Sequence, residues 1–240
     1  MSTVTVPAEV VYQSPPTQVP RPRGTENQSR STMNDLATNT STQATASSEL
    51  VGLVVKGMFR GPVSPELQLV IDAGDAVAKG PMVMPTPAGI SAAGALVRLP
   101  EGSDEEKAVN DFLHAFLPVN RRLRELCTAW QCRPDGSVND HSDAQYDARI
   151  RDQLDDIHTD VSKMLRRAGK QSADLLAYRD QLNVALERFD GGDTASLTSP
   201  LTDGYHTVWM WLHQHVLMML GVTRAEDEAL EEKLVAGSAE

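Results

Sequence analysis

The sequence has few cysteines, few basic residues and no long apolar run, and each shortage excludes a class of protein. Cys127 and Cys132 are the only cysteines among 240 residues. Two thiols five positions apart make neither a disulfide framework nor a zinc site, so we expect buried or half-buried free thiols. No stretch has the length and apolarity of a signal-peptide core or a membrane span. We therefore expect a soluble cytoplasmic protein with no membrane partner.

Basic residues are outnumbered by acidic ones. Lysine and arginine total 22 against 33 aspartates and glutamates, which gives a formal net charge of −11 at pH 7. The charges of the first 47 residues cancel, so the excess negative charge lies in residues 48–240. Because phosphate binding needs clustered lysine and arginine, this balance argues against a broad electrostatic contact with nucleic acid. A local basic patch remains compatible with it.

The chain divides into three parts by composition. Residues 1–47 are rich in Ser, Thr, Pro, Asn and Gln and have little to bury, which predicts a disordered leader. Its proline-rich stretch leaves a partner-binding motif as the alternative, and Met33 is an alternative start. Residues 48–100 form a small segment, for which we predict helix, helix, extended piece and helix. Residues 103–236 are predicted to form a helical bundle.

Local signals mark the elements of the small segment. SELVGLVVKGMF favours a short helix, although its β-branched residues would also suit a strand. PELQLVIDAGDAVAKG allows a second helix, with Pro65 in its first turn. The following PMVMPTPAGISAAGALVRLP predicts a short extended piece and then a helix rich in glycine and alanine.

Apolar spacing and capping residues mark the helices of the bundle. Ser103 and Glu106 form a capping box that begins a helix reaching about Trp130, which Pro118 should kink or divide. Spacings of three and four predict further helices over residues 143–168, 172–189, 205–221 and 224–235. The last of these follows a second capping box, Thr-Arg-Ala-Glu.

The stretch YHTVWMWLHQHVLMMLG, residues 205–221, is the longest dense apolar run. It holds two of the three tryptophans and three of the six histidines, and it is apolar on most sides of a helix. A helix of this kind must be surrounded by other elements, so we predict that it is the central helix of the bundle.

No residue pattern compels an enzyme or a metal protein, a third hypothesis that rests only on the histidines and the Asn-Asp-His string at residues 139–141. His206 and His213 are seven positions apart, about 10.5 Å of helix rise, which is too far to hold one ion. The carboxylates between Asp152 and Asp160 lie opposite an apolar stripe and form a solvated face. We therefore expect no catalytic residue, no metal and no cofactor. His206 or His213 is instead expected inside the bundle, hydrogen-bonded to a carboxylate from another helix.

Two polar features remain as candidate binding sites. Asn139, Asp140 and His141 precede the helix that begins near residue 143; they suit a ligand or metal, but helix capping is the favoured role. Arg121 and Arg122, with a third arginine nearby, either form a solvated helix face or contact an anion or DNA phosphate.

Three strings carry a resemblance to a known family: LCTAWQ (126–131), NDHSDAQYDA (139–148) and DGYHTVWMWLH (203–213). They resemble the helical C-terminal region of actinobacterial MarR-like winged-helix transcriptional regulators. The same region is similar to one attached to some phosphoenolpyruvate/pyruvate-binding, pyruvate phosphate dikinase-like proteins. The resemblance covers roughly residues 108–222.

A winged helix precedes this region in the family. Here MVMPTPAGIS (82–91) resembles its closing piece, and LVVKGMF (53–59) resembles its first helix. Only 28 positions separate Gly57 from Pro85, which is tight for two helices and a wing.

The sequence also departs from the family at positions that bear on DNA binding. The counterpart of a recognition helix, residues 66–79, has Lys79 as its one basic residue, whereas base reading normally uses Arg, Lys, Asn or Gln. Trp211 and His215 stand where the relatives tend to be acidic.

The resemblance implies a non-enzymatic, transcriptional-regulator-type protein. We expect a mainly α fold, in which a reduced winged-helix-like segment and a disordered leader precede the helical bundle. The bundle would serve dimerisation or sensing of a small anionic effector in a homodimer, with at most weak DNA binding. The alternative is a stand-alone regulatory or protein-interaction module without DNA contact.

The expected effector site rests on one hypothesis, that the helix starts near residues 139–143 and 205–206 meet in the fold. The alternative is two unrelated capping sites. The expected ligand-contacting residues are Asn139, Asp140, His141, Tyr205, His206, Arg121 and Arg122.

Overall fold

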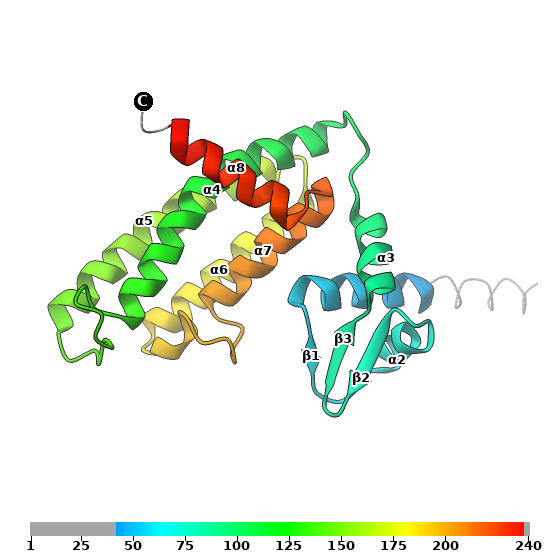
Figure 1. Cartoon of the computed structure of the whole chain (residues 1–240), viewed down its shortest axis with the longest axis horizontal. Helices are drawn as coiled ribbons and strands as arrows, with labels where there is room; N and C mark the ends of the chain where they lie inside the picture. Colours follow the sequence, from blue (N-terminus) through cyan, green and yellow to red (C-terminus); the bar gives the residue numbers. More distant parts are fainter. Residues whose placement is uncertain (1–41, 238–240) are drawn as a thin grey trace, which may run out of the picture. The chain divides into compact units, whose positions relative to one another are not determined.

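The computed structural model describes residues 42–237, which form a mainly α protein with one small sheet (Figure 1). The predicted fold class is therefore confirmed. Of the leader predicted for residues 1–47, residues 1–41 lie outside the described part of the chain. Residues 42–47 belong to a helix that covers 42–56, so the leader boundary at residue 47 is wrong. Ala46 packs on the core used by Leu50 one turn later, which explains the earlier start.

Three short strands and three helices build the small segment. After the helix over 42–56 come β1 (Phe59–Arg60), α2 (Pro65–Asp72), β2 (Ala76–Lys79), β3 (Met82–Pro85) and α3 (Pro87–Val97). The strands pair antiparallel in the order β1-β3-β2. Helix α2 therefore ends at Asp72 rather than near Lys79, because Gly74, with a φ of 82°, turns the chain into the hairpin.

The Thr-Pro-x-Gly part of MVMPTPAGIS fixes the join between the hairpin and α3. The hydroxyl of Thr86 accepts a hydrogen bond from Gly89 N–H at 3.1 Å and donates one to the Gly74 carbonyl at 2.9 Å. Pro87 occupies the first helical position, where its missing N–H costs nothing. A side chain at Gly89 would place its Cβ 1.9 Å from the Asp75 carbonyl oxygen, so only glycine fits this approach.

Five α-helices and one short 3₁₀ turn form the bundle. They are α4 (Asp104–Gln131), α5 (Ala144–Ala168), α6 (Ala173–Asp190), η1 (Thr194–Ser196), α7 (Tyr205–Leu220) and α8 (Arg224–Gly237). The predicted helix ends hold to within about two residues. Helix α4 is continuous through Pro118, so it is not divided there. Buried Phe116, Leu117 and Val119 on both sides of the proline hold the two halves in one core.

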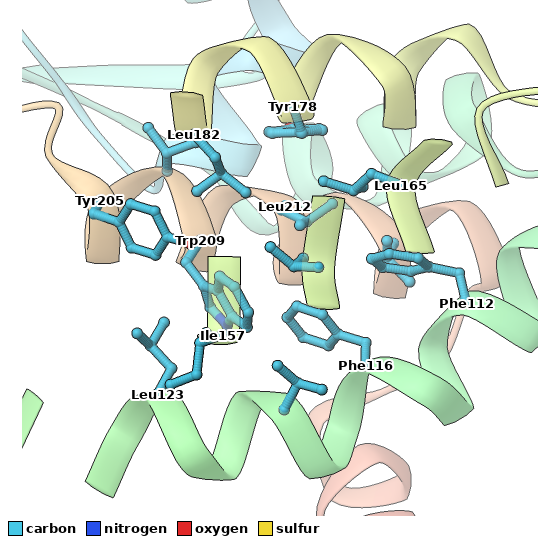
Figure 2. Close-up of a cluster of buried hydrophobic side chains, with 14 of the residues drawn as sticks. Phe112, Phe116, Leu123, Ile157, Leu165, Tyr178, Leu182, Tyr205, Trp209 and Leu212 are labelled. Carbon is cyan, nitrogen blue, oxygen red and sulfur yellow. The ribbon is translucent and has the colours of Figure 1, made fainter. Parts of the chain in front are cut away.

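Helix α7 is buried along most of its length, although it is one of four helices around the bundle core rather than a helix at its centre. Tyr205, Trp209, Leu212 and Val216 are fully buried, and α7 packs against both α4 and α6. Figure 2 shows side chains from α4, α5, α6 and α7 meeting around Trp209. Gly221, with a φ of 58°, ends the helix in the left-handed conformation that favours glycine. Within residues 42–237, no helix has the length and apolarity needed to cross a membrane.

The segment and the bundle have separate hydrophobic cores that meet at α7. Met218 belongs to the core of the segment, whereas its neighbour Met219 belongs to the core of the bundle. The side chain of Trp211 packs against both cores. A backbone hydrogen bond of 3.0 Å joins Leu99 N–H, just after α3, to the Met219 carbonyl.

Candidate functional site

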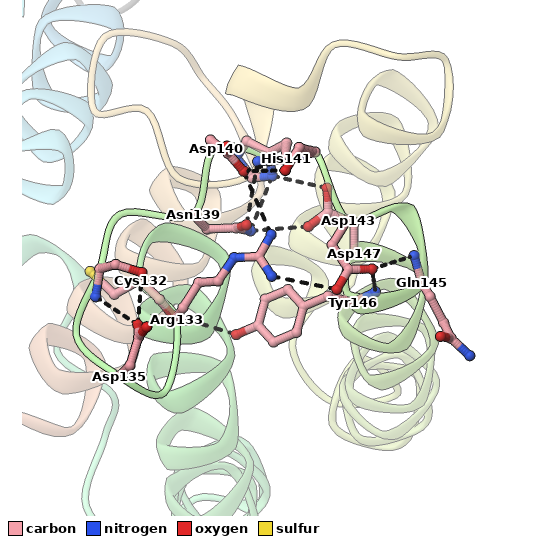
Figure 3. Close-up of polar contacts among 12 residues, drawn as sticks. Cys132, Arg133, Asp135, Asn139, Asp140, His141, Asp143, Gln145, Tyr146 and Asp147 are labelled. Carbon is pink, nitrogen blue, oxygen red and sulfur yellow. Dashed lines mark hydrogen bonds and ion pairs between the residues drawn. The ribbon is translucent and has the colours of Figure 1, made fainter.

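The loop between α4 and α5 is organised by a buried asparagine (Figure 3). Asn139 is 4 % exposed, and its amide nitrogen donates to the Trp130 carbonyl at 3.1 Å and to an Asp147 carboxylate oxygen at 3.0 Å. Its side-chain oxygen accepts from His141 N–H at 3.3 Å. Asn139 therefore connects the end of α4, the loop and the first turn of α5.

His141 closes the same loop from the other side. Its backbone has a φ of 58°, and its Nδ1 lies 3.0 Å from the second carboxylate oxygen of Asp147. Its ring packs against that of Trp130 in a tilted arrangement, with centroids 4.3 Å apart. Arg133 lies within 3.6 Å of both Asp140 and Asp143 and covers the ring of Tyr146.

The acidic residues of the loop act as caps. Asp143 accepts from the backbone N–H groups of Gln145 and Tyr146 at 3.1 and 3.0 Å, and these bonds help hold its pKa below the ordinary value. Hydrogen bonds from Ser142 lower the pKa of Asp140. These contacts are those of helix capping and loop closure, the role favoured from the sequence.

Tyr205 and His206 lie in a different place from the loop. The Tyr205 hydroxyl contacts Nδ1 of His158 at 3.2 Å, and His206 N–H donates to the Leu197 carbonyl at 3.1 Å. Among the described residues, no hydrogen bond or ion pair joins 139–143 to 205–206. The predicted shared cluster is therefore wrong. The loop contacts the first turn of α5 at Asp147, whereas α7 begins beside His158, about 16 Å further along that helix.

Arg121 and Arg122 occupy a third place. Arg122 pairs with Asp160 of α5 at 2.7 Å, and Arg121 pairs with Glu125 at 3.1 Å. They lie about 15 Å along α4 from its end at Gln131, where the loop begins. They line a pocket of about 330 Å³ between α4 and α8, where Glu125 and Glu231 offset their charge. The seven predicted ligand residues thus fall into three separate groups.

The polar contact that the sequence analysis missed centres on His158. Its Nε2 lies 3.0 Å from Asn183 Oδ1 on α6 and 3.3 Å from Ser162 Oγ, while its Nδ1 faces the Tyr205 hydroxyl on α7. One side chain therefore joins three helices. The signal in the sequence was its position directly after buried Ile157, which puts a histidine at the margin of the apolar stripe.

Other buried polar pairs also join helices of the bundle. His213 Nε2 lies 3.0 Å from an Asp227 oxygen on α8, and their side chains are 4 % and 6 % exposed. This confirms the expectation that a histidine of α7 is hydrogen-bonded to a carboxylate from another helix. Trp209 donates its indole N–H to Asn120 Oδ1 on α4 at 2.9 Å.

The two cysteines differ in their exposure to solvent. Burial raises the pKa of the Cys127 thiol to about 12, so it stays protonated and unreactive at neutral pH. Cys132 is exposed at the end of α4, which makes the expectation of a buried or half-buried thiol wrong for this residue. Within residues 42–237, no group of three or more histidine, cysteine, aspartate or glutamate side chains is placed to hold a metal ion.

No protein-family model, curated protein or solved structure matches the chain. The fold and the polar contacts alone define its class. It is a helical bundle, joined through α7 to a small segment of helices and a three-stranded sheet, whose buried polar side chains connect neighbouring helices.

The buried histidines predict how stability depends on pH. Burial lowers the pKa of His158, His206, His213 and His215 below the ordinary 6.5. Below about pH 6.5 the unfolded chain therefore binds protons that the folded protein does not, so the free energy of unfolding should fall as the pH falls. Each such proton contributes at most about 1.4 kcal/mol per pH unit.

Urea unfolding followed by circular dichroism between about pH 8 and pH 5 measures this dependence. His206→Gln should reduce the slope, because it removes one histidine whose pKa is lowered by burial. Stability that is constant or increases as the pH falls from 6.5 would contradict the prediction.

Proposed function

We propose that this protein is a cytoplasmic, non-enzymatic regulatory protein of the transcriptional-regulator type. The helical bundle would serve effector sensing or homodimerisation, and the winged-helix-like segment over residues 42–100 would be the output part. The observation that carries the proposal is the joint at α7. A regulator needs its sensing and output parts to be coupled, and here one helix contributes side chains to both hydrophobic cores.

The joint depends on Trp211, one of the residues that depart from the resembling family. Its ring packs against both cores and lies 4.8 Å from the ammonium nitrogen of Lys56 in the first helix of the segment. An acidic side chain at this position would lose the apolar contact. The departure therefore favours firm coupling of the segment to the bundle.

The charges of the segment support only weak contact with DNA. It has four basic and four acidic residues. The exposed face of α2 presents Gln68, Leu69 and Asp72, none of them basic. Lys56 is engaged with Trp211, and the guanidinium of Arg98 lies against Gly221 at the end of α7, which leaves Arg60 and Lys79 of the sheet for a phosphate contact.

Two basic residues lie together in the sheet. Arg60 of β1 and Lys79 of β2 both pair with Met82 of the central strand, so their side chains point to the same face. Strand spacing puts them about 10 Å apart. We infer that these two residues bind DNA phosphates without reading the sequence.

Titration of labelled duplexes at several salt concentrations tests this function. With two phosphate contacts, the slope of log Kobs against log salt should be no steeper than about −2, with no preference for a genomic fragment over random sequence. The double variant Arg60→Gln/Lys79→Gln should lose the binding that remains at low salt. A steep slope together with a preferred sequence would instead identify a conventional DNA-reading regulator.

A second function, a protein-interaction module without DNA contact, is favoured by one observation. Six large apolar side chains are exposed in the segment: Met58, Val63, Leu69, Val77, Ile90 and Leu96. The same titrations separate the two functions, because complete absence of DNA binding at low salt, with the protein folded, supports the interaction module.

A further inference from the structure

A cleft of about 400 Å³ between α5 and α6 combines cationic and hydrogen-bond-donating side chains. Three cations, Lys163, Arg166 and Arg179, lie beside the network of His158, Ser162 and Asn183. The volume is within the range of small-molecule sites. None of the seven ligand residues expected from the sequence lines this cleft. One of them, Tyr205, contacts His158, which does line it.

The cations of this cleft have little opposite charge around them. In the described part of the chain, Lys163 and Arg166 make no ion pair with a carboxylate. Arg179 contacts Asp180 through Nη2 at 3.1 Å, but its Nε is buried without a hydrogen-bond partner. In a protein with a net charge of −11, this is a local positive excess. A buried donor without a partner is costly, which calls for an acceptor at this point.

The helix dipoles do not explain the arrangement. Arg166 lies in the last turn of α5, where the partial negative charge of the helix favours a cation. Lys163 lies more than one turn before that end. Arg179 lies in the first half of α6, nearer the end of the helix that favours anions. The helix dipoles therefore account for only one of the three cations.

The uncharged groups of the cleft also present donors. Asn183 uses its oxygen to accept from His158 Nε2, which leaves the amide NH₂ group for another acceptor. His158 Nδ1 then accepts from the Tyr205 hydroxyl, so the ring is held in one neutral tautomer. Burial also lowers the pKa of His158. Ser162 adds a hydroxyl beside the same ring.

We propose that this cleft binds a small phosphate-bearing molecule, with Lys163, Arg166 and Arg179 as its charged contacts. A phosphate group has three strong acceptor oxygens and a negative charge, which matches a site made of cations and donors. Arg179 Nε and the Asn183 amide would orient the group, and Lys163 and Arg166 would supply charge.

This binding site would be the effector site of the proposed regulator. Its role in regulation rests on the proposed function, whereas phosphate binding itself does not. A ligand held by Ser162 and Asn183 fixes His158, whose other nitrogen contacts Tyr205, the first residue of α7. Six residues later α7 carries Trp211 at the joint with the segment. The cleft and the output part are thus linked by one helix.

Isothermal titration of the full chain with inorganic phosphate and with glycerol 3-phosphate, at constant ionic strength, tests the site. Both should bind, and glycerol and chloride should not. Tighter binding of glycerol 3-phosphate than of inorganic phosphate would identify the ligand as a phosphorylated molecule. Equal binding of the two compounds would identify it as free phosphate. Either result supports the cleft as a phosphate site. Arg179→Gln or Lys163→Gln should each weaken binding by about tenfold or more, because each removes a charge-assisted hydrogen bond.

Lys233→Gln is the matched control, since it removes one exposed cation from α8, away from the cleft, and the affinity of this variant for phosphate should be unchanged. Melting curves without phosphate establish that the variants are folded. No heat from either phosphate compound, or equal affinity in the Arg179→Gln/Lys163→Gln double variant, would overturn the site.

Failure of the proposed function gives a different result. Phosphate binding that leaves hydrogen exchange of residues 42–100 unchanged would support the cleft and count against regulation through α7. A normal DNA titration with no phosphate binding would overturn the cleft alone.

Discussion

Trp209→Ala is expected to cost about 3–5 kcal/mol of unfolding free energy, as for other large-to-small changes in a packed core. Trp209 is fully buried, and its ring stacks on Phe116 with centroids 4.9 Å apart. Its indole N–H is the partner of Asn120 Oδ1, and Asn120 is itself 5 % exposed. The substitution would therefore open a cavity and also leave a buried acceptor without a donor.

Chemical unfolding followed by circular dichroism measures this loss. Trp209→Phe separates its two parts, since it keeps most of the ring packing and removes the hydrogen bond, and it should cost about 1–3 kcal/mol. The phenylalanine variant also provides a value if the alanine variant fails to fold. A loss below about 1 kcal/mol for Trp209→Ala would mean that the cavity is filled by rearrangement of the core.

The bundle could be predicted from the sequence because its signals are local. The apolar spacing from Tyr146 to Leu165 and the cap at Asp143 determine α5 without reference to any other element. The small segment contains less of this information. Strands β1 and β2 have two and four residues, and they exist only because β3 pairs with both. Pairing of this kind does not appear in a pattern along one strand.

The candidate site could be predicted only in part, for a related reason. Asp143 caps α5 through contacts with its neighbours in the chain, so this capping role could be predicted from the sequence. Whether Tyr205 faces Asn139 or His158 depends on the offset between α7 and α5 along their axes. Apolar periodicity gives the face of a helix but not this offset. The expected meeting of the two helix starts was wrong because this offset could not be predicted from the sequence.

The cleft between α5 and α6 shows the same limit. Lys163 and Arg179 are 16 positions apart in the sequence, and neither is unusual on an exposed helix face. The turn after α5 brings both to one cleft. Apart from the contact of Arg179 with Asp180, these cations have no carboxylate partner. This follows from how the two helices pack, and it cannot be predicted from the amino-acid composition.

His213→Phe is expected to cost about 3–5 kcal/mol, comparable to other losses of one partner from a buried pair. Phenylalanine keeps the ring that lies 5.2 Å from Phe116 but removes the donor from the buried Asp227 carboxylate. Burial lowers the pKa of His213. At about pH 7.5 its neutral ring therefore acts by donating Nε2–H to the carboxylate rather than by opposite charge.

A double variant tests this reason for the loss. Replacing both partners, as His213→Phe with Asp227→Leu, leaves no buried polar group without a partner, so most of the lost stability should return. Arg124→Gln is the matched control, because Arg124 joins α4 to α8 through Glu231 while 54 % of its side chain is exposed. That substitution should cost less than about 1 kcal/mol. If the double variant were as unstable as His213→Phe, packing around the histidine ring would be the cause, and α8 would not depend on the carboxylate contact.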